Sequence, residues 1–323
     1  MSEPASSPKP SYHNNPTEPK LKLPPGAADC HFHIFGPKAK FPFDPKSPYT
    51  PADAPKDVLL DRHMFLGIER GVVVQSAAHG FDNSAAAELL AEKKGSYVGV
   101  ALAPVTTDVS ELKKLHEQGF RGVRFNFVQH LGDAPALADV MKLSTKMASL
   151  GWHLQLHMES GKMVQMSSEL KFSSVPIIID HMGRIDASHG LDQPGFKHLL
   201  KLMEDKRFWV KVSCLERASR QGPPYTDAVP FARKLVAEFG DRCVWGTDWP
   251  HPNLNGIPDD GQLVDLIGEF ADEKQRQALL VDNPLKFYKF TTLKKSWSYC
   301  CSRRCSRSRR LPLPRAIPAN PCA

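Results

Sequence analysis

Short apolar runs alternate with amphipathic stretches along most of this 323-residue chain. Eight runs have the length and the β-branched or aromatic character of strands, and residues 72–74 and 177–179 are apolar without interruption. Uninterrupted apolar runs are typical of parallel strands that are buried on both faces. The predicted strands span residues 28–35, 71–77, 97–103, 122–127, 152–158, 176–180, 208–214 and 243–246.

Most of the intervening stretches carry leucine, methionine or phenylalanine at intervals of three or four, which predicts helices. They span residues 55–67, 83–94, 109–118, 136–150, 194–205, 226–239 and 261–280. Right-handed crossovers return each strand parallel to the one before it, so a repeated strand–helix alternation closes on itself. The pattern predicts an α/β protein with a closed (β/α)8 TIM barrel, a fold that typically needs about 250 residues.

The composition divides the chain into three regions. Residues 1–24 are rich in proline, serine and asparagine, which predicts a disordered leader. Residues 25–290 carry the alternating pattern and form the predicted barrel. Residues 291–323 are rich in serine, arginine and cysteine, which predicts a basic, disordered tail. The composition changes abruptly at this tail, and we favour a misassigned coding segment as its origin.

The positive charge of the chain lies in this tail. The formal net charge is +7, and residues 291–323 contain eight lysines and arginines but no aspartate or glutamate, so the rest carries −1. A basic surface is typical of nucleic-acid-binding proteins, but the predicted barrel has no such excess. We therefore expect no specific nucleic-acid partner.

Other features bear on the compartment. The chain has no run of about 18 apolar residues and no apolar signal region near its start, so we expect a cytoplasmic protein without a membrane partner. Cys30, Cys214 and Cys243 are scattered through the predicted barrel, as reduced core thiols usually are. The tail cysteines lack the paired spacing of a zinc module. The sequence leaves the oligomeric state open.

Polar side chains gather at the predicted carboxyl ends of the strands, where barrel enzymes build their active sites. His31 and His33 end the first strand and share a face, while His181 and Asp248 follow the sixth and eighth strands. A carboxylate beside imidazoles and arginines stays ionised and can act as a general base on water. The imidazoles can donate hydrogen bonds to a carbonyl oxygen, or hold a metal against it, while that oxygen becomes negative.

Arginines add a preference for anions. Arg124 lies in the fourth predicted strand, Arg184 and Arg217 follow the sixth and seventh, and their planar guanidinium groups match carboxylates. Attack of water on an ester-like carbonyl of a small anionic substrate is the reaction that suits this set. Two candidate site residues have alternative roles. Ser76 could cap the following loop, and Arg184 could pair with a neighbouring acid instead of the substrate.

Six motifs, in order, resemble the amidohydrolase superfamily (amidohydrolase-related family 2), and within it the 2-pyrone-4,6-dicarboxylate lactonases. The resemblance covers about residues 27–290. The motifs are DCHFHIFGP at 29–37, VVVQSAAHG at 72–80, GVRFN at 122–126, WHLQLH at 152–157, IIIDHMGR at 177–184 and WGTDWPHPN at 245–253.

The resemblance implies a distorted barrel enzyme, a lactonase, that hydrolyses a carboxylate-bearing lactone in the catabolism of aromatic compounds. A 2-pyrone-4,6-dicarboxylate or a muconolactone would be such a substrate. By the same resemblance the catalytic residues are His31, His33, His181 and Asp248. The implied substrate contacts are Arg124, Arg184, Arg217, Tyr49, Ser76 and His157.

Two departures from the family pattern bear on the substrate and the cofactor. Residues 127–131 lack an arginine that the dicarboxylate lactonases have after the fourth strand, and His157 stands where they have tyrosine. Those lactonases work without metal, so we expect no required cofactor. Zinc-dependent relatives hold a single Zn²⁺ through a set that would here be His31, His33, His157 and Asp248.

These departures keep other functions open. A zinc-dependent decarboxylase or hydratase and a sugar lactonase are alternatives on the same scaffold. An inactive barrel whose basic tail binds phosphates is a third alternative.

Overall fold

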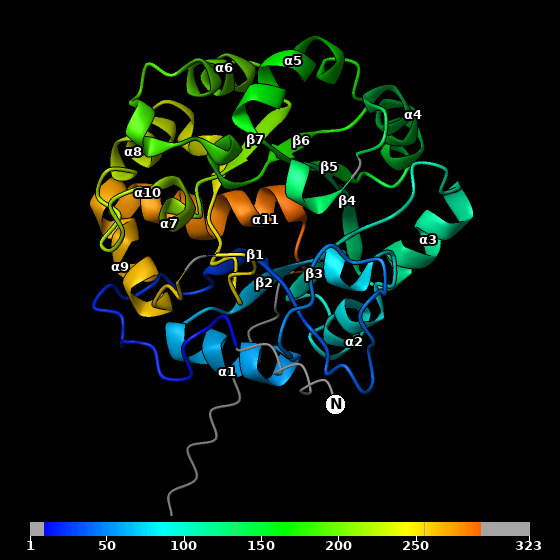
Figure 1. The fold of residues 1–323 in the computed structure, drawn as a ribbon, viewed down its shortest axis with the longest axis horizontal. Helices are drawn as coiled ribbons and strands as arrows, with labels where there is room; N and C mark the ends of the chain where they lie inside the picture. The colour runs from blue at the N-terminus through cyan, green and yellow to red at the C-terminus, as the bar shows by residue number, and fades with distance from the viewer. Residues whose placement is uncertain (1–9, 133, 255, 292–323) are drawn as a thin grey trace, which may run out of the picture. The chain divides into compact units, whose positions relative to one another are not determined.

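The computed structural model describes residues 10–132, 134–254 and 256–291. Eight parallel strands pair in chain order from β1 to β8, and helices surround them (Figure 1). The predicted TIM barrel is confirmed. The strands are β1 Ala28–Phe32, β2 Arg70–Val74, β3 Tyr97–Ala101, β4 Phe120–Phe127, β5 His153–Met158, β6 Ile177–Ile179, β7 Phe208–Lys211 and β8 Cys243–Val244.

The barrel closes through main-chain hydrogen bonds between β1 and the segment that follows β8. Cys30 N donates to the Trp245 carbonyl over 2.8 Å, and His33 N donates to the Trp249 carbonyl over 2.7 Å. Asp248 N likewise donates to the carbonyl of His31 over 2.7 Å. Because β8 has only two residues, this seam is less regular than the seven parallel ladders, and the barrel is distorted here.

The helices lie outside the barrel and follow most of the predicted ranges within a few residues. They are α1 Lys56–Leu66, α2 Ser84–Glu92, α3 Val109–Glu117, α4 Leu137–Ala148, α5 Ser160–Leu170, α6 Pro194–Met203, α7 Leu215–Ala218, α8 Val229–Phe239, α9 Asp260–Phe270, α10 Glu273–Gln277 and α11 Asn283–Tyr288. The single helix predicted over 261–280 is wrong. The chain is extended at Ala271, and Asp272 begins α10 with a capping box.

Two apolar clusters fill the molecule. The larger packs the helices against the outer face of the strands. The smaller lies inside the barrel and includes Ala28, Val72 and Val98 near the strand starts, together with Tyr288 and Phe290 from the end of the described chain. The α11 region thus closes the amino-terminal end of the barrel, and the carboxyl end is left for a site.

The N-terminal segment, residues 10–24, is not the disordered leader that its composition predicts. Tyr12, Leu21 and Leu23 pack against the outer core, and Thr17 N donates to Asp259 Oδ2 over 2.8 Å. These few apolar side chains and main-chain contacts order a segment whose average composition is polar. Residues 1–9 and the tail after Thr291 lie outside the described residues, so the predictions for them are untested.

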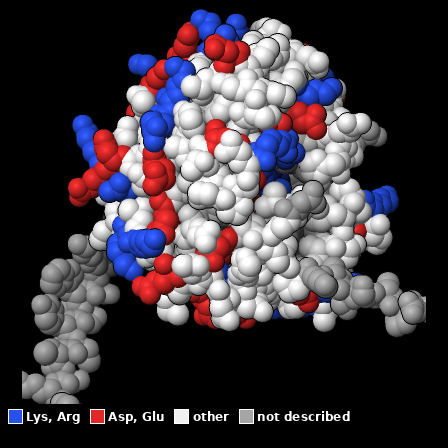
Figure 2. All heavy atoms as spheres, turned by 60° about the vertical axis from the view of Figure 1, so that its left-hand side comes forward, with Lys and Arg blue, Asp and Glu red and all other residues white. Residues whose placement is uncertain are grey.

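Charges of both signs alternate on the face that Figure 2 shows, and no large basic patch interrupts them. Cys30, Cys214 and Cys243 are buried free thiols, as expected. Within the described part of the chain, none of the helices has the length and apolar character needed to cross a lipid bilayer.

Candidate active site

A pocket opens at the carboxyl ends of the strands, and most of the predicted site residues line it. Eight of the ten lie in its lining, and Tyr49 reaches the pocket from the proline-rich loop after β1. The eight are His33, Tyr49, Arg124, His157, His181, Arg184, Arg217 and Asp248. Ala77, His130, Leu131, Pro252 and Asn253 complete the lining.

Asp248 lies at the centre of the predicted catalytic group. Its Oδ1 is 3.6 Å from His31 Nε2, 3.3 Å from His33 Nε2 and 3.8 Å from His181 Nε2. Burial alone would raise the pKa of this carboxyl group, but Arg217 and His181 outweigh it and hold the pKa well below its usual range. Asp248 is therefore an ionised carboxylate at neutral pH.

Local sequence explains how β1 and the turn after β8 meet. Asp29 is fully buried, and its Oδ1 accepts hydrogen bonds from the main-chain nitrogens of His31 and Thr247. Gly246 is necessary at this crossing, because a Cβ at that position would lie 2.4 Å from His31 N. One carboxylate thus fixes the strand that carries His31 beside the turn that carries Asp248.

The hydrogen bonds of the imidazoles determine which nitrogens can act in the pocket. Burial and Lys211 lower the pKa of His31 well below its usual value, so this ring is neutral. Lys211 Nζ, a donor, lies 3.1 Å from His31 Nδ1, and Asp180 Oδ1, an acceptor, lies 3.4 Å from the same nitrogen. Because Lys211 is the nearer partner, we infer that the proton of the neutral ring is on Nε2. His33 Nδ1 lies 2.7 Å from the Val74 carbonyl and must donate to it, so Nε2 is the nitrogen of this ring that faces Asp248.

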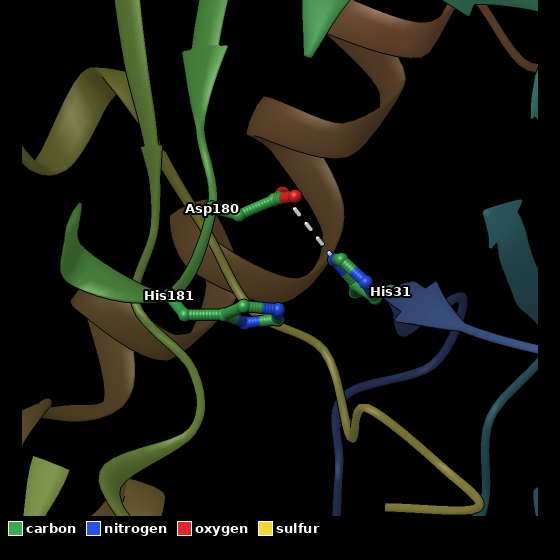
Figure 3. A group of neighbouring side chains, drawn as sticks. All are labelled: His31, Asp180 and His181. Atoms are coloured by element: carbon green, nitrogen blue, oxygen red, sulfur yellow. Dashed lines mark ion pairs between the residues drawn. The ribbon is translucent and has the colours of Figure 1, made fainter. Parts of the chain in front are cut away.

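A buried charge cluster that the sequence analysis missed supports these residues from below. Asp180 Oδ1 is 3.4 Å from both His31 Nδ1 and Lys211 Nζ, and its Oδ2 accepts from Arg124 Nε over 2.9 Å. Figure 3 shows the Asp180 carboxylate pointing toward His31, with the ion pair between them dashed, while His31 and His181 point toward each other from β1 and from the end of β6. The cluster fixes the His31 ring by charge as well as by packing.

The three predicted arginines have different partners. Arg217 donates to Asp248 Oδ2 from Nε over 2.9 Å and from Nη2 over 2.7 Å. Arg124 is held by Asp180, whereas Arg184 has only a contact of 3.2 Å from Nη1 to His157 Nε2. Arg184 is therefore the guanidinium with the most donors left for a ligand, and Arg217 is mainly a partner of Asp248.

Tyr49 and Ser76 lie at one edge of the pocket. Burial raises the pKa of the Tyr49 hydroxyl, which is hydrogen-bonded to Ser76. Ser76 Oγ also accepts from Ala78 N over 3.2 Å, so the predicted capping role is present. Ser76 itself is absent from the pocket lining and reaches the pocket through Tyr49.

The zinc set predicted from the sequence is brought together in part. Possible ligand atoms of His31, His33 and Asp248 lie within 4.8 Å of one another, and two further groups of this kind occur in the described residues. None of the three includes His157, whose nitrogens face Asn126 Oδ1 at 3.1 Å and Arg184. Three of the four predicted ligands thus lie together, and His157 lies outside their group.

Comparison with known proteins identifies the family of this chain. A family profile described as amidohydrolase matches residues 28–290, which include every predicted site residue. The chain belongs to the amidohydrolase family. Membership in this family of hydrolases makes the protein an enzyme.

Individual relatives of the chain are lactone hydrolases. The chain is 43% identical to 2-pyrone-4,6-dicarboxylate hydrolase from Comamonas testosteroni, over 86% of this chain and 94% of that protein. It is 38% identical to 4-sulfomuconolactone hydrolase from Hydrogenophaga intermedia, over 86% of this chain and 93% of the relative.

A solved structure agrees as well. It is described as a probable 2-pyrone-4,6-dicarboxylic acid hydrolase from Acinetobacter baumannii with citric acid bound, and it superposes with a TM-score of 0.73. The two chains are 26% identical, and the match covers 82% of this chain and all of the other.

Proposed function

We propose that this amidohydrolase opens a carboxylate-bearing lactone by attack of water on the ring carbonyl. The observation that carries the proposal is the ionised Asp248 carboxylate, with the His31, His33 and His181 side chains around its Oδ1 and Arg217 on its Oδ2. A fixed carboxylate facing a pocket that also contains arginines can activate water beside an anionic substrate.

The hydrogen-bonding states assign a step to each group. Asp248 Oδ1 is an acceptor, and a water molecule bound beside it and His33 Nε2, which lies 3.3 Å away, can donate a proton to the carboxylate. As the water attacks, Asp248 takes its proton while His31 Nε2–H donates to the carbonyl oxygen, which becomes negative. The ring C–O bond then breaks, and protonated Asp248 returns its proton to the departing ring oxygen.

Charge favours a dicarboxylate or a similar anion as substrate. Among the described residues Arg184 has one hydrogen-bond contact, to His157, and Arg124 lines the same pocket. The substrates named for the relatives, 2-pyrone-4,6-dicarboxylate and 4-sulfomuconolactone, are both anionic lactones. We propose that this chain acts on a lactone of this class, in aromatic-compound catabolism.

The reaction proposed here needs no metal ion. Lys211 and Arg217 already place positive charge on the outer sides of His31 and Asp248, where they do what a bound cation would do for the carboxylate. We expect that a chelator leaves kcat unchanged and that elemental analysis of the active protein finds less than one equivalent of zinc. Loss of activity on chelation and its recovery with Zn²⁺ would favour a zinc-dependent hydrolase, decarboxylase or hydratase instead.

Replacement of the proposed base tests the function itself. We expect Asp248→Asn to lower kcat by about 10³-fold, because the amide cannot accept the proton of water. The loss of ultraviolet absorbance of 2-pyrone-4,6-dicarboxylate, and of muconolactones in parallel, measures ring opening. Asp241→Asn, an exposed aspartate before β8, is the matched control. Wild-type turnover in Asp248→Asn would contradict the proposal.

A further inference from the structure

The N-terminal segment contacts the turn that carries Asp248. The Tyr12 ring packs against the fully buried Trp249 ring, with centroids 4.9 Å apart and planes at 45°. The neighbouring Ser11 hydroxyl donates to the main-chain carbonyl of Pro250. Two successive residues of this segment thus hold the two residues that follow Asp248.

A second series of contacts, made by buried charged side chains, also connects this segment to the turn. Arg62 in α1 donates to the main-chain carbonyl of His13, and its Nη1 lies 2.9 Å from Asp260 Oδ2. Asp260 Oδ1 in turn lies 2.9 Å from His251 Nε2. His251 N donates to the main-chain carbonyl of Asp248 over 2.7 Å, which completes the chain of contacts.

The turn itself has a conformation that needs support. Asp248 has φ +60°, and His251 also has φ +60°, a left-handed region that residues with a Cβ adopt only at a cost. Such conformations persist where the surrounding contacts over-determine them. On the pocket side, β1 supplies those contacts, and on the outer side they come from Tyr12 and from the Arg62–Asp260–His251 series.

Further along, the segment is fixed to α9, the helix that follows the turn. Thr17 Oγ1 donates to Asp259 Oδ2 over 2.9 Å, and Asp259 is the N-cap of this helix. Leu21 N donates to Asp265 Oδ1 over 2.8 Å. The segment therefore bridges the Asp248 turn and the helix after it.

We propose that Tyr12 and Arg62 are positioning residues, which hold the Asp248 carboxylate at the distance from the substrate carbonyl that the reaction requires. The inference rests on the proposed lactone hydrolysis. Neither residue lines the pocket, so each acts only through Trp249 or through Asp260 and His251. Substrate binding by the arginines of the pocket is then independent of Tyr12, whereas the proton transfer to Asp248 depends on it.

A substitution at Tyr12 tests this separation in the full-length chain. We expect Tyr12→Ala to lower kcat about tenfold and to change KM less than about twofold, because small misplacement of a catalytic group costs rate rather than binding. Tyr12→Phe keeps the ring and restores wild-type kcat. Lys22→Ala, which removes a side chain whose partners are Glu18 and Pro19 in the same segment, is the matched control.

Hydrogen–deuterium exchange of residues 246–254 tests, without any substrate, whether the N-terminal segment stabilises the Asp248 turn. We expect exchange there to be about tenfold faster in Tyr12→Ala than in Tyr12→Phe, with the rest of the barrel unchanged. Equal exchange in the two variants, or equal kcat, overturns the inference. If the wild-type protein opens no lactone but exchange still separates the variants, the proposed function fails and the positioning of the turn stands.

Discussion

Arg184 and Arg217 are the same residue type at one pocket, but their neighbours give them different tasks. Nε and Nη2 of Arg217 both donate to Asp248 Oδ2, and Nη2 also donates to the Pro252 carbonyl. Within the part of the chain that the structure describes, Arg184 has one such contact, with His157. A carboxylate of the substrate competes with an ion pair at Arg217 but not at Arg184, so Arg184 is the better anion site.

We therefore expect Arg184→Met to raise KM and to leave kcat nearly unchanged. Loss of a hydrogen bond to a charged group costs about 1.5–3 kcal/mol, which corresponds to an increase in KM of about 10- to 100-fold. Steady-state kinetics with the lactone dianion measures both constants. Arg220→Met removes an exposed arginine that pairs with Asp186 and serves as the control. An unchanged KM in Arg184→Met would show that this guanidinium does not bind the substrate.

The site residues that the sequence predicts stand out more clearly along the chain than those it does not predict. His31, His33, His181 and Asp248 stand at the ends of apolar runs, where polar residues are conspicuous. Asp180 and Lys211 also end such runs, but each was treated as part of its strand. The signal for Lys211 is a lysine that directly follows the apolar residues Phe-Trp-Val, where a charged side chain is unusual. In the structure this lysine has no exposed surface.

Among the elements, β8 separates β7 from β1 in the barrel, and Lys211 joins these two strands in the interior. Its ammonium group donates to Gln155 Oε1 over 2.8 Å as well as to His31 Nδ1 over 3.1 Å. The lysine thus links three strands below the pocket and also determines the His31 tautomer. We therefore expect both the stability of the barrel and the activity of the site to depend on the Lys211 side chain.

We expect Lys211→Met to lower the free energy of unfolding by about 3 kcal/mol, because it leaves Asp180 buried with fewer partners. We also expect kcat to fall, because the proton of neutral His31 is no longer held on Nε2. Urea denaturation and steady-state kinetics measure the two effects. Lys206→Met replaces an exposed lysine just before β7 and should change neither. A variant with full activity would show that the His31 tautomer does not depend on Lys211.

The elements differ in how clearly the sequence predicts them. All eight strands were predicted because buried parallel strands are apolar on both faces, and only their ends differ by a few residues. Helix α5 was missed because serines and Gly161 interrupt its apolar positions Met163, Met166 and Leu170. The order of residues 10–24 depends on tertiary contacts such as Tyr12 on Trp249, which no local pattern contains.

At the scale of the whole molecule, buried histidines make stability depend on pH. Burial lowers the pKa of His31 and His157 well below the ordinary value and that of His181 to about 3. In the unfolded chain the same side chains titrate near pH 6.5. The unfolded state therefore binds more protons below that pH, and stability is full above about pH 6.5 and falls as the pH drops.

Each such histidine contributes up to about 1.4 kcal/mol per pH unit to this loss. Between about pH 6 and pH 4, we expect the free energy of unfolding to fall less steeply with decreasing pH in His157→Gln than in the wild type. The difference in slope is the contribution of one histidine. Denaturant unfolding at a series of pH values measures the slope. His189→Gln changes an exposed histidine and should leave the slope as it is. A slope equal to wild type in His157→Gln would mean that His157 is protonated in the folded protein.

The seam between β1 and the turn after β8 joins distant parts of the chain, since Asp29 and Thr247 are 218 residues apart in sequence. His31 and Asp248 meet only when this last contact of the barrel has formed. Because the entropy of closing so long a loop opposes it, this contact adds to the time that folding takes. A chain in which the seam is open lacks the proposed catalytic pair, so we expect recovery of turnover during refolding to report closure of the barrel.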